Sequence, residues 1–316
     1  MKQTKTKILS PDAHGLREAT DILRAGGLVS FPTETVYGLG ADARDDVAVA
    51  KIYAAKGRPC FNPLIVHLAD VSAVSQYVQM NDAAKRLADA FWPGALTLVL
   101  PVVPVGTISM LVTAGLGTLA VRVPDHPVAT AMLAAFGGPV AAPSANPSGR
   151  ISPTKAAHVL AGLDERIDAV VDGGPCGVGV ESTIVSCVGA PTLLRAGGIS
   201  IEALEACLGA PLLRDEDPDA PVSPGQLASH YAPNGLMRLN ASYAEPHETW
   251  LGFGGMNADL NLSPSGDLTE AAANLFGMLH QLDALGAKYI AVSPIPAHGL
   301  GQAINDRLRR AAAPRD

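Results

Sequence analysis

Aromatic residues and cysteines are scarce in this chain, since aromatics make up 4% of its 316 residues and there are four cysteines. The cysteines form no CxxC pair and have no metal-ligand spacing with the eight histidines. They therefore predict reduced thiols and a cytoplasmic location rather than a disulfide framework or a zinc site. The most apolar stretch, TLVLPVVPV, is short and interrupted by prolines, and no apolar segment follows the charged start MKQTKTK. We expect neither a signal peptide nor a membrane span.

A strongly basic surface is also missing from the sequence. The formal net charge is −7, with 16 Lys and Arg against 18 Asp and Glu in residues 1–210, and 7 against 12 in residues 211–316. Proteins that hold RNA through its phosphates carry a basic stripe or patch. Any polyanion site in this chain must therefore be small and local, which favours a nucleotide over a nucleic acid.

Two common phosphate-binding motifs do not occur. The sequence has no Walker A motif, and no GxGxxG follows an expected strand. Polar residues instead fall on expected loops at strand ends, where open α/β sheets bind ligands. A phosphate site in this chain would therefore be built from side chains.

Expected strands and helices alternate along the first two-thirds of the chain, and several strands, such as LVSF and PVAA, are apolar on both faces. This pattern predicts an α/β fold, a twisted mixed sheet with helices around a cationic cleft. The Pro- and acid-rich stretch GAPLLRDEDPDAPVSPG then predicts a linker. We expect a catalytic domain at 1–208, a linker or lid at 209–235, and a small C-terminal α/β (Rossmann-like) domain at 236–316.

Four polar residues stand out on two expected loops. Lys56 and Arg58 lie at a helix end in KGRP, and Ser144 and Asn146 follow a buried strand in PSANP. Each pair has a simpler explanation, because cations complement a helix C-terminus and SAN can form an ordinary turn. Together, however, they supply an ammonium, a guanidinium, a hydroxyl and an amide. That set can surround a phosphate or a carboxylate without a glycine loop.

Three further residues are unusual for their surroundings. Arg122 lies in the apolar run LAVRVP, and a buried arginine needs either an internal acid or a ligand anion. His67 ends the strand PLIVH and, taken alone, is best explained as a core histidine with a satisfied hydrogen bond. Ser182 follows the Gly-rich turn GGPCGVGV, which lets the backbone approach a ligand closely, although EST by itself means little.

Taken together and in this order, FPTETVYGLG, KGRPCFNPLIVH, FWPGALTLVL, VRVP, AAPSANPSGRISPT, DGGPCGVGVESTIV and LLRAGG resemble the threonylcarbamoyl-AMP synthase family. The resemblance covers about residues 8–205, and its K-x-R and S-x-N elements are intact. The segment HYAPN and the closing GLGQAINDRLRRAA resemble the long, two-domain form, although the C-terminal unit is short for that form.

The resemblance implies an L-threonylcarbamoyladenylate synthase, a nucleotidyltransferase that makes threonylcarbamoyl-AMP and diphosphate from L-threonine, bicarbonate and ATP. Other proteins would then pass the threonylcarbamoyl group to ANN-decoding tRNAs, so we expect a downstream tRNA-modifying partner and no direct tRNA binding. Mg²⁺ would come with ATP, held mainly by the phosphates, and no metal site is expected on the protein.

The same resemblance assigns the site residues. Lys56, Arg58, Ser144 and Asn146 would carry the catalytic chemistry, and Tyr231 in HYAPN would close over the nucleotide; the alternative is that Tyr231 packs on the C-terminal domain. The residues implied for L-threonine are Thr33, His67, Arg122 and Ser182. Those implied for ATP with the bicarbonate-derived group are Lys56, Arg58, Thr113, Ser144, Asn146, Ser152, Arg195 and Tyr231.

Two other classes of function compete with this interpretation. A nucleic-acid-binding module would show salt-dependent RNA affinity, and the acidic charge balance argues against it. A carbamoyl- or acyl-transfer enzyme could use the same cleft with another small acceptor. Release of diphosphate that depends on both ATP and threonine would exclude that second class.

Overall fold

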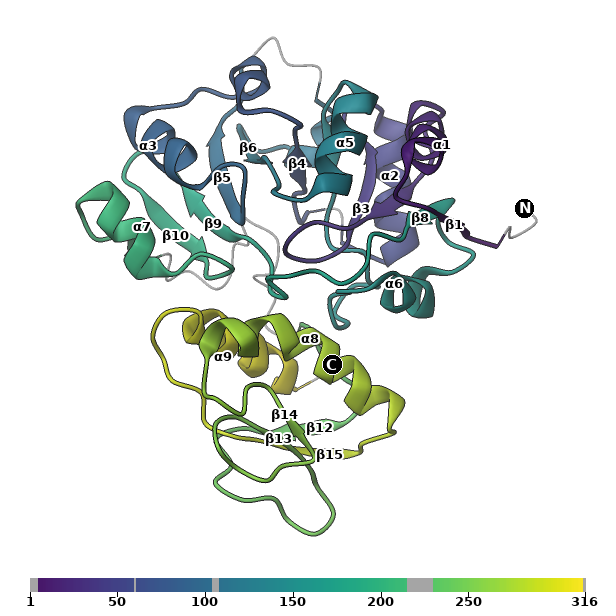
Figure 1. Ribbon diagram of the computed structural model, residues 1–316. Helices are drawn as coiled ribbons and strands as arrows, with labels where there is room; N and C mark the ends of the chain where they lie inside the picture. Colours follow the sequence, from purple (N-terminus) through teal and green to yellow (C-terminus); the bar gives the residue numbers. More distant parts are fainter. Residues whose placement is uncertain (1–4, 60, 104–107, 215–229, 315–316) are drawn as a thin grey trace.

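The computed structural model describes residues 5–59, 61–103, 108–214 and 230–314, which form two units joined through the linker (Figure 1). Most of the expected linker, residues 215–229, lies outside the described residues. Within the described part of the chain, no helix is both long enough and apolar enough to cross a membrane.

The first unit is built on a mixed 11-stranded sheet in the order β1-β8-β2-β3-β7-β4-β6-β5-β9-β10-β11. Neighbouring strands are both parallel, as in β4 with β6, and antiparallel, as in β5 with β6, which confirms the predicted mixed sheet. The strands are β1 (Lys7–Leu9), β2 (Val29–Phe31), β3 (Gly38–Asp42), β4 (Ile65–His67), β5 (Leu96–Pro101), β6 (Thr118–Arg122), β7 (Val140–Ala141), β8 (Ala169–Val171), β9 (Thr183–Ser186), β10 (Thr192–Arg195) and β11 (Leu213–Arg214).

Helices cover this sheet, and most begin at a side chain that caps the free backbone N–H groups of the first turn. Asp45, for example, accepts hydrogen bonds from the N–H groups of Val47 and Ala48 at the start of α2, and Gly57 ends that helix in the left-handed region with φ 61°. The helices are α1 (Ala13–Arg24), α2 (Asp46–Lys56), α3 (Asp82–Phe91), α4 (Met110–Thr113), α5 (Pro127–Phe136), α6 (Ala156–Leu163) and α7 (Ile201–Leu208), with a 3-10 helix, η1 (Val71–Gln76).

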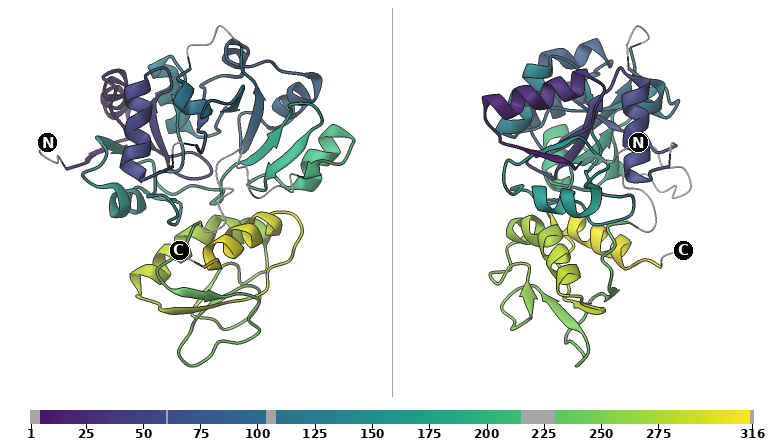
Figure 2. Two further views of the ribbon diagram at one scale, coloured as in Figure 1. Left: turned by 180° about the vertical axis from the view of Figure 1, so that it is seen from behind. Right: turned by 90° about the vertical axis from the view of Figure 1, so that its right-hand side faces the viewer.

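The second unit has a four-stranded sheet in the order β12-β15-β13-β14, and all its strand pairs are parallel. Two helices lie between this sheet and the first unit (Figures 1 and 2). The longer one begins at Asp267, whose carboxylate accepts from the N–H of Glu270 as the capping-box spacing predicts. The elements are β12 (Leu236–Arg238), β13 (Thr249–Gly252), β14 (Leu260–Asn261), α8 (Leu268–Ala284), β15 (Tyr289–Val292) and α9 (Gly301–Ala312).

The interface between the two units is apolar as well as polar. One hydrophobic cluster contains Val36, Ile151 and Val180 of the first unit together with Phe276 and Leu279 of α8. The backbones also approach closely there, because a Cβ on Gly179 would lie 2.4 Å from the Cα of Ala273. The two units therefore share a packed surface in addition to the covalent connection. The first sheet also reaches β11, beyond the boundary expected at residue 208.

Candidate functional site

A small pocket lies over the face of the first sheet where β4, β6 and β7 meet. His67 and Arg122 are register partners in the parallel pair β4 and β6, and Ile65 shares the face of His67. The cavity measures about 40 Å³, far smaller than the few hundred Å³ of a typical small-molecule site. It is lined by eight of the residues predicted from the sequence, namely Thr33, Arg58, His67, Arg122, Ser144, Ser182, Arg195 and Tyr231.

Arg122 meets an internal acid that the sequence did not reveal. Its side chain is buried, and Nη2 lies 2.5 Å from Oε1 of Glu34, while Nη1 donates to Oγ1 of Thr35 at 2.9 Å. Nε donates to the carbonyl of Gly94 at 3.2 Å, so the guanidinium is held in one orientation. The choice left open by the sequence is thereby answered in part: Arg122 has a protein counter-ion, and it also lines the pocket.

His67 is a neutral imidazole directed at the same pocket. Burial, followed by the nearby charge of Arg122, lowers its pKa to about 3. Among the described residues, its Nδ1 is buried and has no hydrogen-bond partner. His67 is therefore a buried histidine with one ring nitrogen that lacks a partner among the described residues. The ring offers a neutral polar atom for a ligand.

Hydroxyl groups line the other side of the pocket. The Thr33 hydroxyl donates to the carbonyl of Val36 at 2.7 Å and lies 2.8 Å from the Thr35 hydroxyl. The Ser182 hydroxyl lies 2.7 Å from that of Thr97, and Nη2 of Arg195 donates to the Ser182 carbonyl at 2.9 Å. These bonds fix the hydroxyls relative to the arginines, so the pocket has a preformed set of donors and acceptors.

Lys56 and the SAN loop form one braced unit beside the pocket. Nζ of Lys56 donates to the carbonyl of Ser144 at 2.6 Å and also to the carbonyl of Asn146. The amide nitrogen of Asn146 donates to the carbonyls of Pro147 and Arg150, both at 2.9 Å. Its Oδ1 is buried with no hydrogen-bond partner among the described residues. These contacts bring Lys56, Ser144 and Asn146 together, although neither Lys56 nor Asn146 lines the cavity itself.

Burial lowers the pKa values of three cations in this region, because it disfavours their charged forms. Burial and the neighbouring charge of Arg58 hold the pKa of Lys56 well below its usual value, and burial lowers the pKa of Arg58 to about 10. Burial also lowers the pKa of Arg195. Several cations that are costly to hold together are stabilised when an anion binds among them. The electrostatics of the site therefore favour an anionic ligand.

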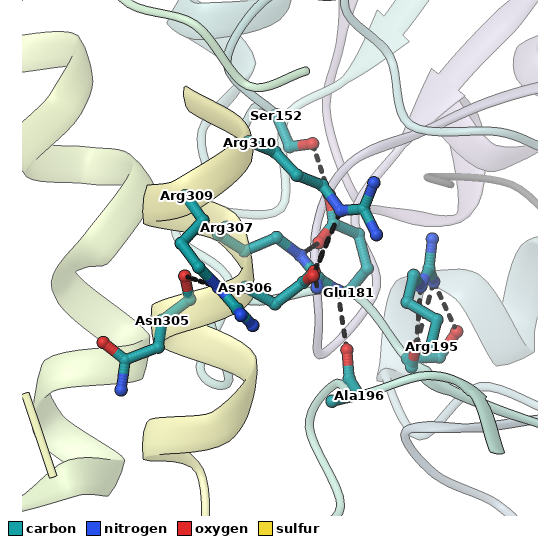
Figure 3. Close-up of polar contacts among 10 residues, drawn as sticks. Ser152, Glu181, Arg195, Ala196, Asn305, Asp306, Arg307, Arg309 and Arg310 are labelled. Atoms are coloured by element: carbon teal, nitrogen blue, oxygen red, sulfur yellow. Dashed lines mark hydrogen bonds and ion pairs between the residues drawn. The ribbon is translucent and has the colours of Figure 1, made fainter. Parts of the chain in front are cut away.

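Thr113 and Ser152, like Lys56 and Asn146, lie outside the pocket lining. Thr113 ends α4, and its hydroxyl donates to the carbonyl of Met110 at 3.2 Å. Ser152 is buried and donates a 2.6 Å hydrogen bond to Oε1 of Glu181, whose other oxygen accepts from Nε of Arg307 at 2.8 Å (Figure 3). Ser152 is thus tied to α9 of the second unit through one carboxylate.

Glu181 and Arg307 form a buried ion pair across the two units. Burial alone would raise the pKa of Glu181, but the charges of Arg307 and Arg195 and the bond from Ser152 hold it at about 2. Arg307 has no exposed surface and also donates to the carbonyl of Ala196 at 2.9 Å (Figure 3). Arg307 was not among the site residues expected from the sequence. The available signal was its spacing, since Arg307 lies on the apolar stripe with Ile304 and Ala311.

Tyr231 contacts both units. Its ring lies 5.4 Å from the ring of Phe276 on α8, and the guanidinium carbon of Arg307 lies 5.2 Å from its centroid. It also lines the pocket, together with His230. The Tyr231 backbone has φ 63°, which is strained for a residue with a side chain. Packing on the C-terminal domain and placement at the pocket, which the sequence posed as alternatives, occur together.

The comparisons with known proteins cover both units. Residues 21–197 match the family described as telomere recombination, and residues 199–313 match the family described as the C-terminal domain of threonylcarbamoyl-AMP synthase. A threonylcarbamoyl-AMP synthase of Bacillus subtilis is 44% identical over 98% of this chain and 96% of its own length. One of Pyrococcus abyssi is 38% identical over 94% of each chain. The crystal structure of P. abyssi Sua5 complexed with L-threonine is similar with a TM-score of 0.89, at 36% identity and 98% coverage of both chains.

Proposed function

The chain belongs to the threonylcarbamoyl-AMP synthase family in its two-domain form, and from this premise we propose how its pocket makes threonylcarbamoyl-AMP for the modification of tRNA. It is an enzyme that transfers an adenylyl group. The proposed substrates are L-threonine, bicarbonate and ATP, and the proposed place of action is the cytoplasm. The buried thiols of Cys176 and Cys187, which form no disulfide, support that location.

The observation that carries the proposal is the convergence of Arg58, Arg122 and Arg195 on one small pocket that also holds a neutral histidine. Arg122 is proposed to bind the threonine carboxylate, because a guanidinium can grip a carboxylate with two parallel hydrogen bonds. Thr33, His67 and Ser182 would surround the rest of the amino acid. The unpaired Nδ1 of His67 suits the threonine hydroxyl.

ATP is proposed to bind next to this amino acid. Arg58, Ser144 and Arg195 line the pocket, and Lys56 and Asn146 brace the loop that carries Ser144. Ser152 and Thr113, which lie outside the cavity, would reach the nucleotide only at its periphery. The remaining proposed ATP contact is Tyr231.

The proposed reaction requires little covalent work from the protein. The threonine amine attacks the carbon of bicarbonate: a C–N bond forms, a C–O bond breaks, and the departing hydroxyl leaves as water with an amine proton. The resulting carbamate oxygen attacks the α-phosphate, and a new O–P bond forms as the bond to diphosphate breaks. Rate would come from alignment of the two substrates and from cations that stabilise charge on the α-phosphate and on the departing diphosphate. Arg58 and Arg195 are placed for that second task.

Mg²⁺ is proposed to arrive with ATP. No group of three or more His, Cys, Asp or Glu side chains suited to a metal occurs within the described ranges, and Glu34 and Glu181 are paired with arginines. Phosphate oxygens, rather than these two paired carboxylates, are the proposed ligands of Mg²⁺. No step is assigned to a protein-bound metal.

Tyr231 is proposed to be part of a lid. The cavity of about 40 Å³ is too small for a nucleotide, and His230 and Tyr231 are among its lining residues; their movement is the proposed way of making room for ATP. A closed lid would exclude water and protect the mixed anhydride from hydrolysis. The threonylcarbamoyl group would then pass to tRNA by downstream proteins, with no direct tRNA binding by this chain.

The decisive experiment measures diphosphate release and threonylcarbamoyl-AMP formation with purified full-length chain. We expect both products only when ATP, bicarbonate and L-threonine are all present. Omitting threonine, or replacing it with glycine, is the control for an unrelated ATP hydrolysis. Diphosphate release that is indifferent to threonine would overturn the proposal and favour transfer to a different acceptor. Salt-dependent binding of RNA would favour the nucleic-acid module.

A further inference from the structure

A second and much larger cavity lies between the two units. Its volume is about 710 Å³, within the range of sites that bind small molecules and cofactors. It shares only one lining residue with the small pocket, the guanidinium-bearing Arg195. The first unit contributes β10, the start of α7 and Arg214 of β11, and the second unit contributes α9 and the ends of two strands.

The position of this cavity in the second unit is the one where parallel sheets bind ligands. Leu239 and Asn240 directly follow β12, and Val292 and Ser293 lie at the end of the neighbouring β15. These are the carboxyl ends of two adjacent parallel strands. In open α/β sheets the loops at that edge form the ligand crevice. None of the roles proposed for the reaction uses this edge.

Positive charge is concentrated at this cavity although the second part of the chain is acidic. Residues 211–316 carry 7 Lys and Arg against 12 Asp and Glu, yet Arg214, Arg309 and Arg310 all line this one cavity, and Arg195 joins them from β10. Asp306 is the one acid among the described lining residues, and it already accepts from Nη1 of Arg307 at 2.6 Å and from Nε of Arg310 at 3.1 Å. Arginines therefore outnumber acids among the described lining residues.

The arginines have different structural surroundings. Arg309 and Arg310 lie at the end of α9, where cations complement the helix dipole, and Figure 3 shows Arg195 across from that helix on the first unit. The dipole does not account for Arg195 or Arg214, which come from strands. Two separate units thus direct guanidinium groups at one space. The remaining walls combine apolar surface from Leu193, Leu239, Val292 and Leu308 with the polar groups of Asn240 and Ser293.

We propose that this interdomain cavity is a second binding site, which takes a small phosphate-bearing molecule. Guanidinium groups would bind its phosphates, and the apolar walls suit a flat ring such as a nucleobase. Two sources provide this chemistry: a nucleotide such as AMP, or free diphosphate. Because Arg195 borders both cavities, a ligand here would bind beside the active site without occupying it. Among the described lining residues, Arg195 alone has a role in the proposed reaction; the test uses Arg214 and Arg309 instead, so the inference can fail while that reaction stands.

The test is equilibrium binding of inorganic diphosphate and of AMP, in separate titrations, to the full-length chain. The variant is Arg214→Ala with Arg309→Ala; neither residue has a role in the proposed reaction. We expect two binding events per wild-type chain for at least one probe, and loss or at least tenfold weakening of one event in the variant. Arg17→Ala, on the exposed side of α1, is the matched control for loss of a surface arginine and should bind like wild type.

The two probes distinguish the sources. Weakening of both identifies the shared phosphate chemistry with room for a nucleoside, and weakening of diphosphate alone identifies the free anion. A single event per chain for both probes in wild type, or two unchanged events in the variant, would overturn the proposal. Arg214→Lys with Arg309→Lys keeps the charge and should retain most of the second event. Thermal unfolding of each variant verifies that the fold is intact.

Discussion

Arg307→Met removes one partner of the buried ion pair that joins the two units. Nε of Arg307 lies 2.8 Å from Oε2 of Glu181, and the Arg307 side chain has no exposed surface. Breaking such a pair leaves an unpaired buried charge and costs about 3–5 kcal/mol. That is a large part of the about 5–15 kcal/mol by which a domain is usually stable. We expect Arg307→Met to weaken the interface severely.

The assay can follow each unit separately, because Trp92 belongs to the first unit and Trp250 to β13 of the second. Urea unfolding followed by fluorescence, with Trp92→Phe and Trp250→Phe backgrounds, should show the second unit separating at lower denaturant. Arg309→Met, on the exposed side of the same helix, is the control and should change unfolding by less than about 0.5 kcal/mol.

The stability contributed by the Glu181–Arg307 pair should depend on pH in a defined direction. The pKa of Glu181 is held at about 2, below its value of about 4.3 in an unfolded chain. A lowered carboxyl pKa contributes stability above the unfolded value, and that contribution is lost as pH falls toward 2. Without Arg307 the pKa of Glu181 should rise. The stability difference between wild type and Arg307→Met should therefore shrink between pH 7 and pH 3.

A double variant separates charge from packing. Glu181→Gln with Arg307→Met removes both charges, and Gln can still accept the hydrogen bond from Ser152. We expect it to recover most of the stability lost in Arg307→Met, because replacing a whole buried pair is often neutral. If Ser152 contacts ATP, the KM for ATP should recover in parallel. A cost below about 1 kcal/mol for Arg307→Met, or a double variant no more stable than the single one, would refute the reasoning.

Four further changes test the small pocket. Lys56→Ala and Arg58→Ala should each reduce adenylate synthesis by tenfold or more, because a lost charge-assisted contact to a phosphate costs about 1.5–3 kcal/mol. Diphosphate release near the wild-type rate at saturating substrates would contradict the assignment of these residues to an anion site. Arg122→Lys should raise the KM for threonine far more than the KM for ATP, because lysine cannot make the two-bond contact to a carboxylate. An equal rise in both KM values, found also in Glu34→Gln, would instead identify Arg122 as a structural ion-pair partner. Tyr231→Ala should weaken ATP binding and speed product loss, and wild-type affinity and turnover would contradict the lid.

The sequence predicted which residues lie near the pocket better than it predicted the ion pairs between them. Lys56, Ser144 and Asn146 could be grouped in advance because each follows a recognisable helix or strand end, and loops at such ends converge. The pairing of Arg122 with Glu34 could not be predicted, since Glu34 lies in the polar loop PTET, where nothing in the local pattern indicates burial. An ion pair between residues far apart in the chain depends on tertiary packing, which periodicity does not report.

Arg307 is a second residue whose ion-pair partner could not be predicted from the sequence. Its place on the apolar stripe of α9 was visible in the sequence, but its partner Glu181 is 126 positions away. A buried arginine implies that an acid lies near it in the fold, but it does not indicate which acid. Identifying that acid requires knowing that α9 faces the Gly-rich turn before β9, which is a property of the interface between the two units (Figure 3).

The second unit therefore shapes the site without placing a catalytic group in it. Gly179 has φ 75°, and a Cβ there would lie 2.4 Å from the backbone of Ala273, so the turn before β9 is held against α8 by main-chain contact. Arg307 fixes Glu181 at the end of that turn, and the next residue, Ser182, lines the pocket. Because two contacts from the second unit act on one short turn, the position of Ser182 depends on the interface as well as on the first unit. The acidic second domain can thus set the geometry of a cationic site.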